Sequence, residues 1–188
     1  MDLVEEVVPL GDRELAVLRP RDADALIDEH TFEADEFLPY WAQLWPSGVA
    51  LARAVAARAL KGAKVLELGC GLGLPSIAAA RAGGRVLATD WSPGAVDLLR
   101  SNAERNGATL EVAVVSWTEP AELLDRAPFQ LVLAADVLYE RRNVPVLADL
   151  LPRLGSEILL ADPGRAHLEE FLERTGTVWA RPPVYRLR

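Results

Sequence analysis

The stretch Val65-Leu66-Glu67-Leu68-Gly69-Cys70-Gly71-Leu72-Gly73-Leu74 decides the fold of this chain. A short apolar run enters a glycine-rich turn and then a segment with helical character. An α/β protein uses this arrangement to bring bare backbone to a nucleotide-like ligand at the end of its first strand.

The spacing of the glycines excludes a dinucleotide fingerprint. The third glycine, Gly73, comes one residue early, and Leu74 stands where a Gly or Ala is required. The sequence G-K-S/T of a phosphate-binding loop is also absent. What remains is E-x-G-x-G with Glu67 inside the strand, and this carboxylate suits a ligand that carries an ammonium or sulfonium charge.

Composition limits the classes of protein to consider. With 188 residues, 51% of them hydrophobic, the chain is expected to fold as one globular domain, 1–188. Its net charge of −8 argues against binding to nucleic acid. The charge is compatible with a basic protein partner, and the alternative, which we prefer, is that it only keeps the protein soluble. No apolar run approaches the ~20 residues of a membrane span, so no membrane association is expected.

Cysteine and histidine are both rare. A lone cysteine, Cys70, and an N-terminus without a positively charged leader predict a cytoplasmic protein. The two histidines, His30 and His167, lie far apart in the sequence, so no metal site is expected.

Beyond residue 62 the chain alternates between short apolar runs and segments with helical spacing. Strands that are apolar on both faces, separated by helices, predict a doubly wound, mostly parallel α/β sheet with helices on both faces. Before it, a helix from a Ser47 cap to Leu60, ended by Gly62, and a strand Glu14–Arg19 are expected, with a short helix capped by Asp22 between them. The predicted strands are Lys64–Leu68, Arg85–Thr89, Leu110–Val115, Gln130–Ala134 and Glu157–Ala161, and the predicted helices are Leu74–Ala82, Pro93–Arg105, Pro120–Leu124, Arg142–Leu151 and Ala166–Arg174.

Chemistry-bearing residues follow the predicted strands. Ligands bind at the carboxyl ends of parallel strands, so Asp90 after the second strand is predicted to accept the hydroxyls of a ribose. The alternative is a loop carboxylate that caps the next helix, although Ser92 is better placed for that. Trp91 and Ser116-Trp117 border the same crevice, where the tryptophans either flank an adenine or pack in the core.

Two further segments complete a resemblance to a known family. Glu67-x-Gly69-x-Gly71 with Asp90 resembles the class I, seven-strand methyltransferases that use S-adenosylmethionine. The segments Pro39-Tyr40-Trp41-Ala42-x-x-Trp45-Pro46-Ser47-Gly48 and Asp136-Val137-Leu138-Tyr139 resemble the family-16 protein-lysine methyltransferases, in particular the branch that methylates the electron-transfer flavoprotein beta subunit. The resemblance covers about residues 35–165 and is much less specific for the substrate than for the family.

The resemblance implies a Rossmann-like seven-strand core over 47–188, with an N-terminal segment and aromatic lid over 1–46. It implies S-adenosylmethionine as cofactor, S-adenosylhomocysteine as product, and a protein lysine as acceptor, in an electron-transfer flavoprotein or a translation protein. Asp136 and Tyr139 would face the acceptor amine. The residues that would bind the cofactor are Trp45, Glu67, Gly69, Cys70, Gly71, Asp90, Trp91, Ser116 and Trp117, with Cys70 as a small filler in the turn.

These residue types suit methyl transfer. A lysine amine has a solution pKa near 10.4 and must lose a proton before it attacks. Asp136 could align the amine, but its charge also favours the ammonium, so we assign it to binding and alignment. Tyr139 offers a hydroxyl and a ring face, and the segment Phe37–Trp45 would exclude water from the donor.

Some alternatives stay open. A small amine of the nicotinamide type could replace the lysine, and a non-catalytic nucleotide-binding module is a further reading that the intact Glu67, Asp90 and Asp136 oppose. After Arg174 only a very short C-terminal hairpin fits, Thr177–Trp179 and Val184–Leu187, or the last strand is incomplete. Arg165 could contact the substrate or form a structural ion pair.

Overall fold

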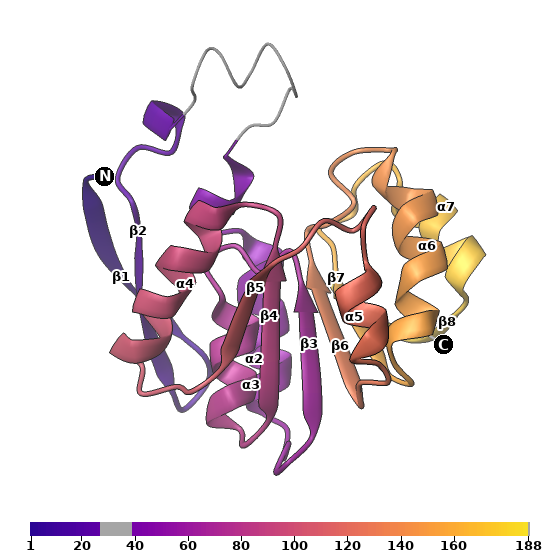
Figure 1. The fold of residues 1–188 in the computed structure, drawn as a ribbon, viewed down its shortest axis with the longest axis horizontal. Helices are drawn as coiled ribbons and strands as arrows, with labels where there is room; N and C mark the ends of the chain where they lie inside the picture. The colour runs from indigo at the N-terminus through magenta and orange to yellow at the C-terminus, as the bar shows by residue number, and fades with distance from the viewer. Residues whose placement is uncertain (27–38, 188) are drawn as a thin grey trace.

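The computed structural model describes residues 1–26 and 39–187, and for 177–181 only the course of the backbone. Its centre is a seven-stranded sheet in the order β5-β4-β3-β6-β7-β9-β8 (Figure 1). The first five of these strands are parallel. Their bounds are β3 (Lys64–Leu68), β4 (Arg85–Asp90), β5 (Glu111–Val114), β6 (Leu131–Ala135) and β7 (Ile158–Ala161). The predicted doubly wound sheet is therefore confirmed.

Strand order reverses beside β3. The chain moves outward from β3 through β4 to β5, then returns to the other side of β3 with β6 and β7. The carboxyl ends of β3 and β6 therefore flank the switch point, where an open sheet leaves room for a ligand.

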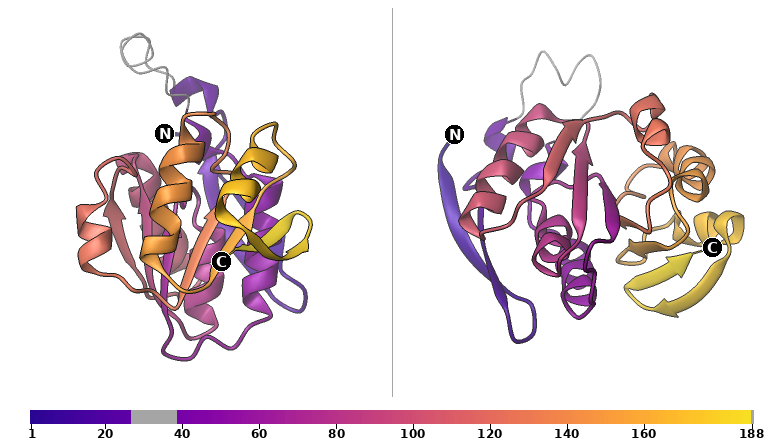
Figure 2. Two further views of the ribbon diagram at one scale, coloured as in Figure 1. Left: turned by 90° about the vertical axis from the view of Figure 1, so that its right-hand side faces the viewer. Right: turned by 60° about the horizontal axis from the view of Figure 1, so that its bottom comes forward.

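Helices cover both faces of the sheet (Figures 1 and 2). Successive strand residues point to opposite faces, so Val65 belongs to one buried cluster and Leu66 to the other. Residues of α2 (Pro46–Ala56), α3 (Leu74–Arg81) and α4 (Pro93–Arg105) pack in the first cluster. Residues of α5 (Ala121–Asp125), α6 (Asn143–Leu154) and α7 (Leu168–Thr175) pack in the second.

The short C-terminal hairpin forms two strands, and both pair within the sheet. β9 (Val184–Leu187) lies antiparallel to β7 over its whole length, and β8 (Thr177–Arg181) pairs with β9 at the edge of the sheet. The backbone N–H of Asp162 also donates to the carbonyl of Pro183 at 2.9 Å. The alternative of an incomplete last strand is thus excluded.

An N-terminal hairpin lies against α4. The sequence predicted its second strand, β2 (Glu14–Pro20), but not its partner β1 (Leu3–Pro9). The amide of Asn102 bonds the backbone N–H and carbonyl of Leu18 at 2.7 and 3.1 Å, and Asn106, one turn later, does the same for Ala16. Two side chains therefore satisfy backbone groups on the free edge of β2, in the manner of a neighbouring strand.

The predicted start of α2 was wrong, whereas the Asp22 cap predicted before it is confirmed. α2 begins at Pro46, which lacks an N–H and suits a first helical position, and Ser47 is buried without capping the helix. The helix ends at Ala56, earlier than predicted. Asp22 does accept the backbone N–H of Asp24, but the segment it caps is one 3-10 turn, Asp24–Leu26.

We predict that Gly73→Ala destabilises the protein through a steric clash. Gly73 has φ +83°, and a Cβ there would lie 1.8 Å from Cδ1 and 2.9 Å from Cγ of Leu99, a fully buried side chain of α4. Gly11→Ala is a matched control, because Gly11 has φ +81° and no atom within 4 Å of its Cβ position. The clash should make Gly73→Ala less stable than the control by about 1–3 kcal/mol in chemical denaturation. Equal losses would contradict it.

Candidate functional site

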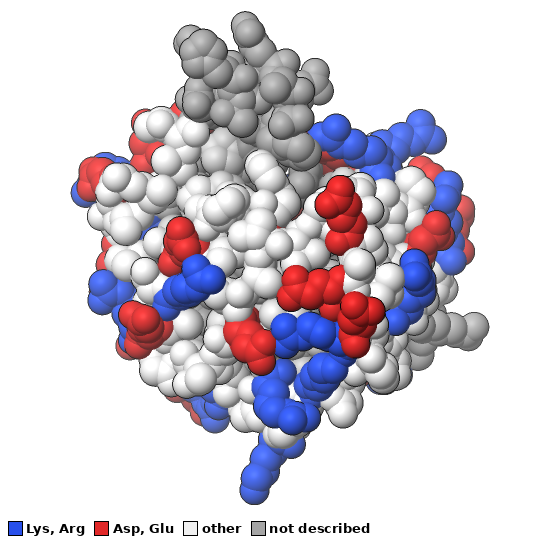
Figure 3. All heavy atoms as spheres, viewed as in Figure 1, with Lys and Arg blue, Asp and Glu red and all other residues white. Residues whose placement is uncertain are grey.

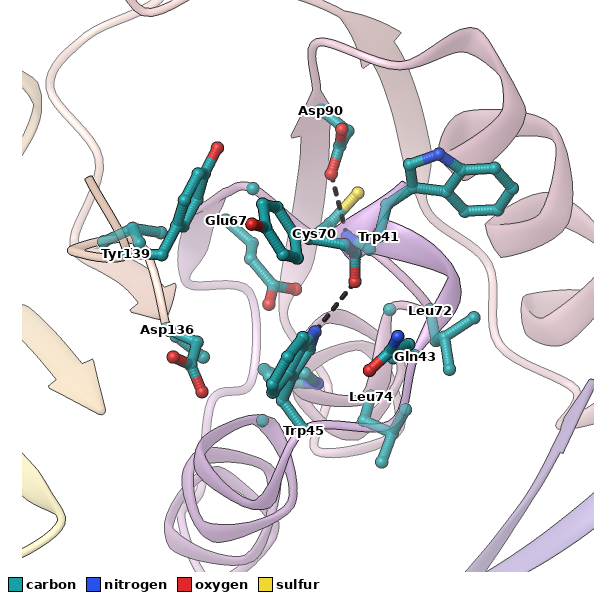
Figure 4. A pocket seen from close by; sticks show the side chains of 18 of the residues that line it. Trp41, Gln43, Trp45, Glu67, Cys70, Leu72, Leu74, Asp90, Asp136 and Tyr139 are labelled. Carbon is teal, nitrogen blue, oxygen red and sulfur yellow. Dashed lines mark hydrogen bonds between the residues drawn. The ribbon is translucent and has the colours of Figure 1, made fainter. Parts of the chain in front are cut away.

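One cavity opens at the carboxyl ends of β3, β4 and β6 and is covered by residues 40–45 (Figure 4). Its empty volume is about 950 Å³ with the open solvent at its mouth included. Ser116 does not line it, and its Oγ lies 2.8 Å from Oγ1 of Thr118. The other predicted site residues line it: Trp45, Glu67, Gly69, Cys70, Gly71, Asp90, Trp91, Trp117, Asp136 and Tyr139.

The glycine turn forms the floor of this cavity. Gly71 has φ +49°, and a Cβ there would lie 3.2 Å from the carbonyl oxygen of Trp41 in the covering segment. Trp117 lies at the other end of the turn, where its Cζ2 is 3.1 Å from the Cβ position of Gly69. Cys70 is buried and fills the turn, whereas Trp91 is 40% exposed at the rim.

Glu67 lies at the end of β3 and is 1% exposed. One of its carboxyl oxygens accepts a hydrogen bond from Oγ of Ser76 on α3. Burial away from water raises the pKa of Glu67 to about 8, and this effect exceeds the opposing effect of the Ser76 bonds. Glu67 is therefore largely protonated at pH 7, and a cation entering the cavity would favour its ionised form.

Asp90 ends β4 and organises the turn. Its Oδ2 accepts the backbone N–H of Gly71 at 2.9 Å (Figure 4), and its Oδ1 accepts that of Ser92 at 3.0 Å. Ser92 occupies the N-cap position of α4 as predicted, but its side chain makes no capping hydrogen bond. Its backbone N–H is instead bound by Asp90. Since a carboxylate has about four acceptor positions, Asp90 can still accept ribose hydroxyls. Burial raises its pKa.

Asp136 follows β6 in a left-handed conformation, with φ +59°. Its Oδ1 accepts a hydrogen bond from Nε of Arg165 at 2.5 Å and forms an ion pair with Nη2 of the same guanidinium. Its Oδ2 is buried and has no hydrogen-bond partner among the described residues. Such a strained backbone and an unpaired buried oxygen are typical of functional positions.

Tyr139 stands on the same side of the cavity as Asp136 (Figure 4). Its ring centroid lies 5.1 Å from that of Tyr40. The loop that carries both residues is fixed by Asn143, whose Nδ2 donates to the carbonyl of Val137 at 3.0 Å. Burial is the main cause that raises the pKa of Tyr139 to about 12, so the hydroxyl keeps its proton.

Trp45 lines the cavity. Its Nε1 donates to the carbonyl of Tyr40 at 2.8 Å, and its ring centroid lies 5.7 Å from the Arg165 guanidinium carbon. Phe37 and Leu38 of the predicted lid lie outside the described residues. Tyr40, Trp41 and Arg165 also line the cavity. Of these three, the sequence offered only Arg165 as a substrate contact, with a structural ion pair as the alternative. The only sequence signal for Tyr40 and Trp41 was their place in the aromatic segment.

Within residues 1–26 and 39–187, no cluster of three or more His, Cys, Asp or Glu side chains is arranged to bind a metal. No helix in that part of the chain is long and apolar enough to cross a membrane.

Residues 31–172 match the family model described as lysine methyltransferase. The chain belongs to that family. The electron transfer flavoprotein beta subunit lysine methyltransferase of Xenopus laevis is 36% identical over 138 residues, which are 68% of this chain and 54% of that protein. The histone-arginine methyltransferase METTL23 of Mus musculus is 33% identical over 142 residues, 72% of this chain and 51% of that protein. The chain thus spans about half the length of these curated relatives.

Solved structures support the fold of this family member. The 16S rRNA N2 G1207 methyltransferase RsmC of T. thermophilus, in complex with AdoMet and guanosine, superposes with a TM-score of 0.64 at 17% identity. The match covers 99% of this chain and 49% of that one. At this identity the likeness shows the fold alone.

Proposed function

We propose that the protein transfers a methyl group from S-adenosylmethionine to the side-chain amine of a lysine in a protein substrate. The observation that carries the proposal is the cavity itself. It joins the E-x-G-x-G turn on one side to Asp136, with its unpaired Oδ2, and Tyr139 on the other. Neither half alone would favour methyl transfer over simple ligand binding.

The residues of the turn fit the cofactor. Glu67 would bind its positively charged methionine end, and the open acceptor positions of Asp90 would take its ribose hydroxyls. The bare backbone at Gly71 lets a ligand approach the turn, and Trp117 beside Gly69 would pack on the adenine. When bound, S-adenosylmethionine supplies an electrophilic methyl group on a sulfonium.

Asp136 and Tyr139 would orient the acceptor. The amine would lose a proton to solvent, and its lone pair would then form the N–C bond while the electron pair of the broken C–S bond goes to sulfur, which becomes a neutral thioether. Oδ2 of Asp136 would accept an N–H of the amine and direct the lone pair along the line of attack. Tyr139, which stays protonated, would hold the amine with its hydroxyl or ring face. Trp45 would keep water away from the donor.

The partner we propose is a protein with an accessible lysine, an electron-transfer flavoprotein or a translation protein. The names of the relatives support a protein substrate, and the net charge of −8 favours a basic one. On the face in Figure 3 acidic and basic groups are interspersed.

We further propose that residues 1–46 and 47–188 act together as one domain in a reducing cytoplasm, in agreement with the lone buried Cys70.

The proposal predicts that radiolabel from S-adenosylmethionine enters a protein band when the purified enzyme is added to a lysate of its source. Mass spectrometry of the band should place the methyl group on a lysine. The same incubation with Asp136→Asn should leave the band unlabelled. Label in arginine, or in small molecules alone, would contradict a lysine acceptor, and failure to bind S-adenosylmethionine in calorimetry would contradict the methyltransferase assignment.

A further inference from the structure

Arg165 contacts one oxygen of Asp136 and leaves the other unpaired. Both Nε and Nη2 of the guanidinium are directed at Oδ1. The Asp136 side chain is 6% exposed, and its Oδ2 has no partner in the described part of the chain. An unpaired buried oxygen is costly, so this arrangement indicates that a ligand provides the missing donor. Asp136 itself lines the cavity.

The position of Arg165 is fixed independently of Asp136. Asp162, at the end of β7, accepts the backbone N–H groups of Gly164 and Arg165 through its Oδ1 at 2.8 and 2.7 Å. On the other side, the guanidinium faces the ring of Trp45. Arg165 is therefore held at its backbone and its side chain by two elements that do not depend on the ion pair.

The charge of Arg165 affects how easily the acceptor amine beside Asp136 loses its proton. A lone carboxylate beside a lysine raises the pKa of the amine and so opposes the proton loss that attack requires. A guanidinium on the same carboxylate offsets this effect. Among the residues that the structure describes, the other ionisable groups that line the cavity are Tyr40 in the covering segment, Glu67 on β3, Cys70 in the turn, Asp90 on β4 and Tyr139 after β6.

We propose that Arg165 is a positioning residue for methyl transfer. It holds Oδ1 of Asp136, leaves Oδ2 as the hydrogen-bond acceptor for the incoming amine, and offsets the carboxylate charge so that the amine can lose its proton. This inference rests on the proposed function, but its central claim concerns the binding of a cation and can be measured without turnover.

The test compares Arg165→Gln, which removes the charge, with Arg165→Lys, which keeps it. The probe is n-butylammonium chloride, titrated by calorimetry at pH 7 into protein saturated with S-adenosylhomocysteine. Removal of the guanidinium leaves the Asp136 charge uncompensated, so Arg165→Gln should bind the probe roughly tenfold more tightly than wild type. Arg165→Lys should resemble wild type.

Steady-state kinetics provide the second measurement. The acceptor is unmethylated protein of the kind that the lysate experiment identifies. Arg165→Gln should lower both KM and kcat, and its kcat should recover as pH rises toward 10, because alkali then removes the proton that Arg165 no longer helps to release. Arg58→Gln is a matched control. Arg58 pairs with Glu157 at 2.8 Å at a similar exposure, 32% against 29% for Arg165, and does not line the cavity. Its kinetics and probe affinity should equal those of wild type.

A purely structural role for Arg165 would give a different pattern. The probe would bind Arg165→Gln no more tightly than wild type, or not at all, and kcat would fall equally at every pH; either result overturns the inference. If wild type labels no protein but the probe still binds Arg165→Gln more tightly, the proposed function fails while the charge relation stands. The two failures are therefore distinguishable.

Discussion

Replacing Asp136 with Asn should lower the methyl-transfer rate by roughly 10²- to 10⁴-fold and leave the affinity for S-adenosylmethionine within about threefold. The expected loss arises at Oδ2, the oxygen that Arg165 leaves unpaired. In the variant an amide NH₂ can occupy that place and present a donor to an amine that needs an acceptor. The turn of Glu67, Gly71 and Asp90 is untouched, so the cofactor should still bind.

Asn is the informative substitution because of the backbone. Asp136 has φ +59°, and among the residues that the structure describes it is the one non-glycine with a positive φ. Asn tolerates this left-handed conformation better than Ala does, so Asp136→Asn should fold normally. Its remaining oxygen can still accept from Nε of Arg165.

The measurements are single-turnover transfer and calorimetric binding of S-adenosylmethionine. Asp149→Asn, at an exposed position on α6, is the matched control and should behave as wild type in both. An equal loss of transfer and of cofactor affinity in Asp136→Asn would contradict the assignment of Asp136 to the acceptor. Full activity would exclude it from the reaction altogether.

The sequence predicted the sheet well because its strands are read from local composition. A buried parallel strand is a short apolar run, so β3, β4 and β6 could be bounded to within a residue or two. The position of Asp90 followed from the rule that ligands bind at the carboxyl ends of parallel strands, and Asp136 was indicated by the family resemblance. The cavity confirms that these two residues and Glu67 lie around the same space.

Other features depend on tertiary contacts that leave little trace in the sequence. Ser47 satisfies the composition of a helix cap, but Pro46 begins the helix and Ser47 is buried. Apolar and polar residues alternate only weakly along β1. The free edge of β2 is bound by Asn102, on a helix distant in sequence. The ion pair of Arg165 with Asp136 requires β6 and β7 to be neighbours in register, which no local pattern specifies.

The structure also changes the interpretation of Glu67. The sequence predicted an ionised carboxylate that binds a cation, whereas burial keeps Glu67 largely neutral at pH 7 in the absence of a ligand. Binding of a sulfonium and an ammonium should therefore ionise Glu67 and release a proton. The same burial that prepares the site for a cation must then cost stability whenever Glu67 is ionised without one.

Glu67→Gln should consequently make the protein more stable at pH 8.5 and weaken its binding of S-adenosylmethionine by at least about tenfold. The pKa of Glu67 is raised from 4.5 to about 8, so between these values the folded state binds more protons than the unfolded state. The free energy of unfolding of the wild type then falls as pH rises through this window, by up to about 1.4 kcal/mol per pH unit from this group. Gln carries no charge and escapes that loss.

The decisive measurement is the free energy of unfolding of both proteins from pH 4 to pH 9. The two free energies of unfolding should be nearly equal near pH 4.5, where Glu67 is neutral in folded protein and half-neutral in unfolded protein. The difference between them should then grow as the pH is raised to 8. Glu104→Gln, at an exposed position on α4, should follow wild type throughout. Parallel curves for wild type and Glu67→Gln would exclude a buried, protonated Glu67. An unchanged cofactor affinity at pH 8.5 would instead show that the ionised carboxylate does not bind the methionine end, because Gln lacks both its charge and one of its acceptor oxygens.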